Sequence, residues 1–286
     1  MDRRNLFIDG VNLNETNSLK HLLENSEHDE DEEVNLIQHS LYYDVQEFVN
    51  MINANNGLSI LDLNIQSINA KYDDFKIFME RVNIMNPVSV VCLNECWIKE
   101  NDNISNFNLN NYNMVFQCRQ RDTSSTNGGL LIYVHEQFKC TNIIIDQISS
   151  NWEYLCVEIC HFKPHSKKHV ICNVYRKPGG NVPDIELFID EFSTLLKKIQ
   201  YRKHSAFICG DFNIDILKLN VNIHISNYFN SIISCGFIPL ITLPSRLSDH
   251  SHTLIDNILT NNVEPKHISG VLSNQLSDHQ IFFSYL

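Results

Sequence analysis

Short apolar runs of strand length recur along most of this sequence, and they constrain its fold more than any other feature. They lie at residues 58–65, 88–95, 112–117, 129–134, 142–148, 154–159, 170–175, 206–209, 254–259, 267–272 and 281–285. Helical spacing of apolar residues occurs only over 70–85, 183–199 and 223–235, with a short further helix near 43–51. Because strands mostly follow one another instead of alternating with helices, the pattern predicts two stacked sheets covered by helices, not a Rossmann fold.

The first 56 residues have a different composition from the rest. Residues 1–50 carry 12 acidic and 3 basic side chains, which gives −9 of the total net charge of −12. The run EHDEDEE, Glu27 to Glu33, is typical of a solvated segment. We therefore predict an acidic, weakly ordered lead-in at 1–56 and one domain at 57–286. The body of the chain is nearly neutral, so its charge neither indicates nor excludes a nucleic-acid partner.

The nine cysteines indicate a reduced, intracellular protein. Cys92, Cys156, Cys172 and Cys209 lie inside apolar runs, as small buried side chains do. Cys92/Cys96 and Cys156/Cys160 repeat a C-x3-C spacing. Neither pair is followed by paired histidines or by a turn-borne C-x-x-C at zinc-site spacing, so a structural zinc is not predicted. No apolar run is long enough to span a membrane, and we predict no membrane partner.

The segment AFICGDFNIDI contains an apolar run that ends in Asp211 and Asn213. In an extended chain, residues two apart point to the same side, so these two polar groups would converge beyond the strand. Asp and Asn after Gly are also typical of a turn, and this segment alone leaves both readings open.

Polar groups end six apolar runs of the chain in a similar way. The residues concerned are Asn64, Glu95, Tyr175, Asp211 with Asn213, Asp256, and Asp278 with His279. If the carboxylates cluster, they need a cation, and all-oxygen ligands favour Mg²⁺ or Mn²⁺ over zinc.

At this point the sequence resembles the endonuclease/exonuclease/phosphatase superfamily, and within it the apurinic-like endonuclease domain of non-LTR retrotransposons. The matching stretches, in the family's order, are LDLNIQSINAKYDDF, VVCLNECWI, NGGLLIYV, HVICNVYRKPG, FICGDFNIDI, PSRLSDHSHTLIDNIL and LSDHQ. The resemblance covers about residues 58 to 286. It implies an α/β (α+β) fold, a four-layer sandwich of two mixed β-sheets flanked by helices, which is DNase I-like.

The resemblance also implies roles for the polar residues. Glu95 is similar to the family's main metal carboxylate, with Asn64 beside it, and Mg²⁺ would neutralise the scissile phosphate. His279 is similar to the histidine that contacts the phosphate or activates water. Asp256 is similar to the carboxylate that pairs with this histidine and raises its pKa.

Four further residues receive catalytic roles in the same way. Asp211 would orient the attacking water or protonate the leaving oxygen, and Asn213 would donate a hydrogen bond to the phosphate. Tyr175 would bind or polarise that phosphate, and Asp278 would support His279 or the metal.

Arg246 and Thr253 match places where the family touches DNA or supports the site. The implied activity is a Mg²⁺-dependent phosphodiesterase that nicks one DNA strand and leaves a 3′-hydroxyl to prime reverse transcription. The family would place such a protein in the nucleus, with a reverse-transcriptase domain in cis that this chain does not contain. The alternatives are a non-catalytic remnant or binding module, a superfamily phosphatase, and an abasic-site repair nuclease.

Overall fold

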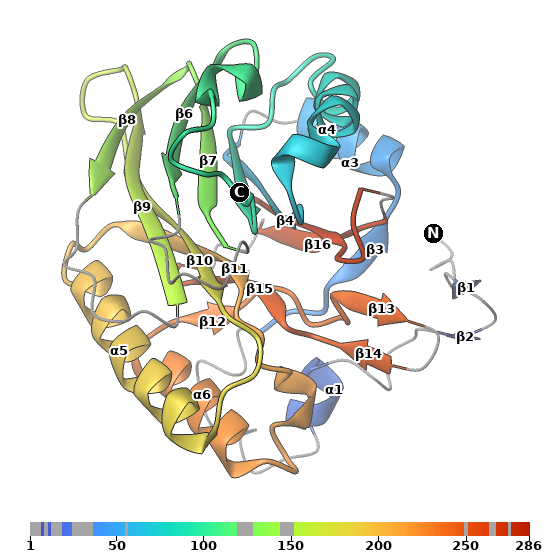
Figure 1. Cartoon of the computed structure of the whole chain (residues 1–286), viewed down its shortest axis with the longest axis vertical. Coiled ribbons are helices and arrows are strands. Elements are labelled where there is room, and N and C mark those ends of the chain that lie inside the picture. The colour runs from blue at the N-terminus through green and yellow to red at the C-terminus, as the bar shows by residue number, and fades with distance from the viewer. Residues whose placement is uncertain are drawn as a thin grey trace.

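Two mixed β-sheets pack face to face and carry helices on their outer faces (Figure 1). This computed structural model describes residues 7–8, 11–12, 19–24, 37–54, 57–118, 128–143, 152–248, 251–262, 267–273 and 276–286. The arrangement is the four-layer α/β sandwich expected from the sequence, and that prediction is confirmed.

The first sheet has seven strands in the order β3-β16-β17-β4-β5-β7-β6. The pairs β3/β16 and β4/β5 are parallel, and the other pairs are antiparallel. Its strands are β3 (Leu41–Tyr43), β4 (Ser59–Asn64), β5 (Val90–Asn94), β6 (Tyr112–Gln117), β7 (Leu130–His135), β16 (Ile268–Leu272) and β17 (Ile281–Tyr285).

The second sheet has six strands in the order β12-β15-β11-β10-β9-β8. Only β10 and β11 run parallel in it. Its strands are β8 (Phe138–Ile143), β9 (Trp152–His161), β10 (Lys168–Arg176), β11 (Ser205–Asp211), β12 (Ile238–Pro239) and β15 (Asp256–Thr260). Two further antiparallel pairs stand apart, β1 (Phe7–Ile8) with β2 (Val11–Asn12) and β13 (Arg246–Ser248) with β14 (Ser251–Thr253).

Helices α3 (Val45–Asn53) and α4 (Ile68–Val82) cover the first sheet, and α5 (Val182–Gln200) and α6 (Ile223–Ser234) cover the second (Figure 1). The start of α5 is fixed by a capping box between Asn181 and Asp184, with Pro183 in the first turn. Its apolar side packs on the sheet through Phe188, Phe192 and Leu196 among others. No helix in the described ranges combines the length and the apolar character that crossing a bilayer requires.

Strand alternation decides which side chains enter the space between the sheets. In β5, Val91 and Leu93 pack against the helices, while Val90 and Cys92 face the other sheet. Because side chains alternate along a strand, Asn94 also points into the space between the sheets. The same rule turns Asp62 and Asn64 inward from β4, so polar side chains are buried where the two sheets meet.

The limits of several elements differ from the sequence prediction. A strand was expected at 142–148, but β8 begins at Phe138 and pairs with β9, and residues 144–148 lie outside the described residues. The sequence also did not indicate β3, which adds to the sheet edge beside β16.

Both β3 and α3 lie before residue 57 and pack with later elements. Leu19 of α1 (Leu19–Glu24) also donates its N–H to Thr242 O. The division of the chain at residue 57 stays a prediction.

Gly210 allows β11 to approach β10 closely, one residue before Asp211. Its φ is +145°, and a Cβ at this position would lie 1.9 Å from the carbonyl oxygen of Val174, its partner in β10. Since the atom in the way belongs to the backbone, a side chain at 210 would force the two strands apart.

We therefore expect Gly210→Ala to lower the free energy of unfolding by more than about 3 kcal/mol, measured by urea denaturation. Gly236→Ala is the matched control, because Gly236 also has a positive φ of 75° but no backbone atom close to its Cβ position. The control should cost about 1–2 kcal/mol. Equal losses in the two variants would contradict the steric explanation.

Candidate active site

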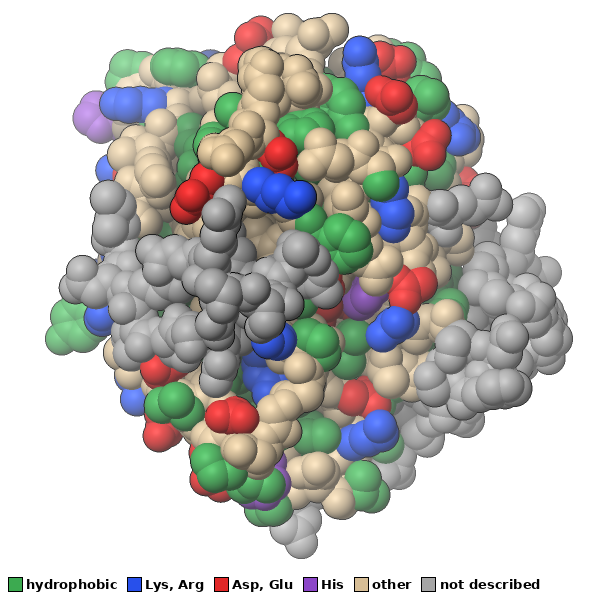
Figure 2. Space-filling model, in the orientation of Figure 1, with side chains coloured by type: hydrophobic (Ala, Val, Ile, Leu, Met, Phe, Trp, Pro, Cys, Tyr) green, Lys and Arg blue, Asp and Glu red, His purple; other side chains and the backbone are tan. Residues whose placement is uncertain are grey.

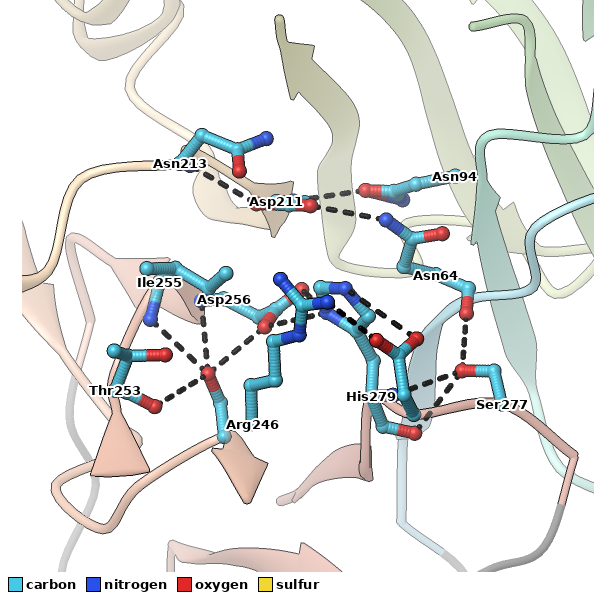
Figure 3. Close-up of polar contacts among 12 residues, drawn as sticks. Asn64, Asn94, Asp211, Asn213, Arg246, Thr253, Ile255, Asp256, Ser277 and His279 are labelled. Atoms are coloured by element: carbon cyan, nitrogen blue, oxygen red, sulfur yellow. Dashed lines mark hydrogen bonds and ion pairs between the residues drawn. The ribbon is translucent and has the colours of Figure 1, made fainter. Parts of the chain in front are cut away.

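The predicted site residues come together at one edge of the two packed sheets. Figure 3 labels Asn64, Asp211, Asn213, Arg246, Thr253, Asp256 and His279 among them. They are carried by the ends of β4, β5, β10 and β11, the start of β15, the hairpin β13–β14 and the segment before β17. Hydrogen bonds and ion pairs link the two sheets there, so residues that are far apart in the sequence form one cluster. The residues so placed are Asn64, Glu95, Tyr175, Asp211, Asn213, Arg246, Thr253, Asp256, Asp278 and His279.

Asn64 lies between two carboxylates. Its Nδ2 donates to Glu95 Oε1 and to Asp211 Oδ2, both at 2.9 Å. Its own Oδ1 is buried and has no hydrogen-bond partner among the described residues. An amide oxygen without a partner beside two carboxylates is an all-oxygen donor set, which fits a hard divalent cation such as Mg²⁺.

Backbone hydrogen bonds join the segments that follow β4 and β5, next to Asn64 and Glu95. Ile65 N donates to Asn94 O, Ser67 N donates to Glu95 O, and Ile68 N donates to Cys96 O, at 2.9 to 3.1 Å. Glu95 has a φ of 50°, so the chain leaves β5 in a left-handed conformation. The side chain of Glu95 therefore does not follow the inward and outward alternation of strand β5.

Asp256 and His279 form a buried pair. His279 Nδ1 lies 3.0 Å from both carboxylate oxygens of Asp256, and the His279 side chain is only 3% exposed. One ligand atom from each of Asp211, Asp256 and His279 lies within 4.8 Å of the other two. The carboxylate of Asp256 and the imidazole of His279 therefore lie in the same small volume as the carboxylate of Asp211.

Two serines hold this pair in place. Ser245 Oγ accepts the N–H groups of Ile255 and Asp256 and donates to Asp256 Oδ2 at 2.8 Å. Ser277 Oγ donates to Asn64 O at 2.7 Å and accepts the N–H of His279 at 3.0 Å. Ser277 therefore links the histidine half of the site to the Asn64 half (Figure 3).

Charges around His279 favour its protonated form. Burial is the largest single influence and lowers its pKa, but three neighbouring carboxylates outweigh burial and raise the pKa to about 9. Asp256 contributes most of this increase, followed by Asp211 and Asp278. Burial and then Asp256 raise the pKa of the Asp211 carboxyl well above its ordinary value, although His279 acts in the opposite direction.

Asp211 and Asn213 form a turn, not a continued strand. Strand β11 ends at Asp211, Asn213 has a φ of 49°, and its N–H donates to Asp211 Oδ1 at 2.9 Å. Of the two readings that this segment left open, the structure therefore shows the turn, since the left-handed residue directs the chain away from the line of β11. Asn213 Nδ2 donates to Arg176 O, and the Arg176 guanidinium donates to Asn213 O at 3.2 Å.

Asp278 and Arg246 form the rim of the site. Their side chains are 41% and 47% exposed and make an ion pair at 2.5 Å. Asp278 Oδ1 also lies 4.0 Å from His279 Nε2. Burial works against ionisation of Asp278, but His279 and Arg246 outweigh it and lower its pKa. Thr253 faces Arg246 in the hairpin and accepts a hydrogen bond from Ser245 N through its carbonyl oxygen.

Tyr175 is buried beside Asp211, because the two residues are register partners on β10 and β11. Its place next to Asp211 agrees with a position in the floor of the site. Tyr175 is 2% exposed, so its side chain has almost no contact with solvent in this conformation.

The sequence analysis missed several residues that hold the site together. Asn94 Oδ1 accepts the N–H of Asp211 at 2.8 Å, and its Nδ2 donates to Asp62 and Asn173. Strand alternation could have indicated Asn94, because it is two residues beyond Cys92 in the same apolar run. No local pattern marks Ser245, Ser277 or Arg176. Their contacts with Asp256, Asn64 and Asn213 join residues 11, 213 and 37 positions apart in the sequence.

Acidic and basic side chains are interspersed over the face that Figure 2 shows, without a patch of one sign in its described part. Among the described residues, the basic side chains nearest the site are few, and two of them already have partners. Arg246 pairs with Asp278, and Arg176 is bonded to backbone carbonyls. Lys71 of α4 is close enough to Asp278 and Glu95 that they act on its pKa, although burial, the larger influence, lowers it.

Comparison with known proteins agrees with this geometry. The profile of the Endonuclease/Exonuclease/phosphatase family matches residues 49–279. No curated protein sequence matches the chain. Among solved structures, the AP endonuclease LMAP from Leishmania major has a TM-score of 0.64 at 12% identity, covering 93% of this chain and 98% of that one.

Two further structures have the same fold. The endonuclease domain of TRAS1, a telomere-specific non-LTR retrotransposon, has a TM-score of 0.59 at 12% identity, with 81% of this chain and 98% of that chain covered. The catalytic domain of human Nocturnin with bound sulfate has a TM-score of 0.56 at 17% identity, with 80% and 92% covered. At such identities these matches show the fold alone.

The pKa of His279 can be measured by NMR titration of its imidazole in the metal-free protein. We expect a value of about 9, and we expect Asp256→Asn to lower it because the strongest neighbouring negative charge is removed. A His279 pKa at or below 6.5 would contradict the conclusion that the neighbouring carboxylates outweigh burial and raise this pKa.

The same shift predicts how stability depends on pH. The folded pKa lies above the unfolded value of about 6.5, so the contribution of His279 is fully present below about pH 6.5 and is lost as pH rises through 9. Its size is on the order of 3 kcal/mol. Unfolding free energies measured from pH 6 to 10 should therefore fall more in the wild type than in His279→Gln.

Proposed function

The chain belongs to the endonuclease/exonuclease/phosphatase family, and on this basis we propose that it is a Mg²⁺-dependent endonuclease that nicks one strand of DNA. Membership confirms the resemblance that the motifs indicate, and it makes a nuclease or related phosphodiesterase the class of activity to test. The observation that carries the proposal is the meeting of an oxygen-rich group, Asn64 with Glu95 and Asp211, with the cationic His279.

Asn64 and Glu95 would hold the divalent metal, with Mn²⁺ as a possible substitute for Mg²⁺. The bound ion would supply positive charge to the scissile phosphate and to the leaving oxygen. The unpartnered Oδ1 of Asn64 and the carboxylate of Glu95 are the groups available for this purpose.

His279 would act as a charged clamp on a phosphate oxygen. With a pKa of about 9 it carries a proton at neutral pH, and a protonated imidazole can donate a hydrogen bond but cannot accept a proton. Asp256 fixes the ring through Nδ1 and leaves Nε2 for the substrate. Asn213 and Tyr175 would add hydrogen bonds to the same phosphate, as stabilisation of a charged transition state requires.

Asp211 would orient the attacking water and take its proton. Its raised pKa makes the buried carboxylate a stronger base than an exposed aspartate. The water oxygen would bond to phosphorus while the P–O3′ bond breaks, and the leaving O3′ would take a proton from solvent, which gives a 3′-hydroxyl and a 5′-phosphate. Asp278 would keep His279 charged.

DNA is the proposed substrate, because the reacting groups lie at the floor of a site whose rim is formed by exposed charged side chains. Arg246 at this rim would contact a flanking phosphate, and Thr253 would support the hairpin that carries it. A nuclear location and a reverse-transcriptase domain acting in cis also remain proposals that follow from the retrotransposon resemblance. An abasic-site nuclease is the second candidate, favoured by the match of 93% of this chain to an AP endonuclease.

Supercoiled plasmid tests the activity directly. We expect conversion to open circles with Mg²⁺ and none with EDTA, and a loss of rate of at least about 100-fold in Asp211→Asn and in His279→Gln. Asp190→Asn is the matched control, since Asp190 is exposed on α5, and it should nick like the wild type. A polymerase that extends the nicks without prior phosphatase treatment would identify 3′-hydroxyl ends.

A duplex with one abasic site separates the two candidates. Rapid cleavage of this duplex beside slow plasmid nicking would favour the repair nuclease. A folded chain that cleaves neither DNA with Mg²⁺ or Mn²⁺ would contradict the proposal and favour a non-catalytic module or a phosphatase.

A further inference from the structure

The indole of Trp97 is hydrogen-bonded to the carboxylate of Glu95. Trp97 Nε1 donates to Glu95 Oε2 at 3.1 Å, while the other oxygen, Oε1, accepts from Asn64 Nδ2 at 2.9 Å. Each oxygen of Glu95 therefore has one N–H donor, one from the end of β4 and the other from the segment after β5. A carboxylate held by two donors keeps one orientation, because rotation about its terminal bonds would break both contacts.

The backbone around Trp97 is held in a conformation that L-residues rarely adopt. Glu95 has a φ of 50° and Trp97 a φ of 55°. Cys96 N donates to Gly129 O at 3.0 Å, and Trp97 N donates to Gly128 O at 2.8 Å. These two hydrogen bonds to Gly128 and Gly129 fix the unusual conformation. The conformation brings the Trp97 indole next to the Glu95 carboxylate, two residues earlier in the chain.

Trp97 is half-buried, whereas Glu95 is 9% exposed. The indole therefore shields one side of the carboxylate from water. It does so without adding a positive charge that would compete with a metal ion, because the indole N–H is a neutral donor. A neutral donor is the kind of outer contact that orients a metal-binding carboxylate and leaves its charge available.

We propose that Trp97 is a positioning residue that orients Glu95 for divalent-metal binding. The inference rests on the proposed function insofar as Glu95 is the metal carboxylate. It goes beyond that function in making the metal affinity depend on a neutral indole that neither touches the substrate nor ligates the ion.

The second tryptophan of the chain provides a matched control. Trp152 Nε1 donates to Glu191 Oε2 at 2.7 Å, and both residues are buried between β9 and α5. Trp152→Phe removes the same kind of hydrogen bond as Trp97→Phe, but outside the site. A general loss of stability should affect both variants, whereas a loss of metal affinity should be confined to Trp97→Phe.

Isothermal titration with Mn²⁺ and with Mg²⁺ measures this difference without any nuclease assay. We expect Trp97→Phe to weaken metal binding about 10-fold, and Trp152→Phe to leave it within twofold of the wild type. Thermal unfolding of both variants reports their folding. Binding by a folded Trp97→Phe protein that stays within twofold of the wild type would overturn the inference.

Fluorescence supplies a second measurement that leaves Trp97 intact. In Trp152→Phe, Trp97 is the only tryptophan. Saturating Mg²⁺ should change the tryptophan emission because the ion binds to the carboxylate that the indole contacts. Glu95→Gln in the same background should abolish this response. An unchanged emission at metal concentrations that saturate the calorimetric titration would contradict the inference, even if Trp97→Phe fails to fold.

These outcomes separate the inference from the proposed activity. Metal binding that depends on Trp97, in a chain that cleaves no DNA, would support the positioning role and contradict the nuclease. Mg²⁺-dependent nicking by a Trp97→Phe protein with unchanged metal affinity would support the nuclease and contradict the positioning role.

Discussion

The alignment of the two sheets depends on one buried amide, that of Asn94. It accepts the N–H of Asp211 from the second sheet and donates to Asp62 in its own sheet and to Asn173 in the opposite one. Asn173 Nδ2 in turn donates to the carbonyl oxygens of Leu93 and Leu131 across the interface. Leaving a buried polar group unpaired costs about 1–3 kcal/mol, so sliding one sheet over the other would break several such contacts at once. Apolar packing alone would not fix that position as closely.

This alignment matters because the site is divided between the sheets. Asn64, Glu95 and His279 come from the first sheet or its loops, and Asp211 and Asp256 come from the second. Their side chains meet only when β4, β5 and β11 are correctly placed. Gly210 also helps to place Asp211, because it allows the close approach of β11 to β10 one residue before Asp211.

The site concentrates negative charge, and the fold tolerates it by two means. Asp256, Asp211 and Asp278 surround one imidazole, which becomes cationic in response. Amide, hydroxyl and indole N–H or O–H donors satisfy the remaining carboxylate oxygens. Strained backbone is concentrated in the same region, because five of the eight described non-glycine residues with positive φ adjoin the site: Gln66, Ser67, Glu95, Trp97 and Asn213. Such conformations persist only where the surrounding contacts hold them.

The sequence by itself determined the two-sheet architecture and indicated the polar residues that the structure brings together at one edge. Apolar runs of strand length predicted the two sheets, and polar residues at the ends of those runs marked the edge where Asn64, Asp211 and His279 meet. These features are local, because strand alternation and helix spacing are written in neighbouring residues. The choice between strand and turn at Asn213, the contacts of Ser245 with Asp256 and of Ser277 with Asn64, and the pKa of His279 were decided only by the tertiary structure. They depend on partners that are distant in the sequence and on burial, and neither is set by the residues adjacent in the chain.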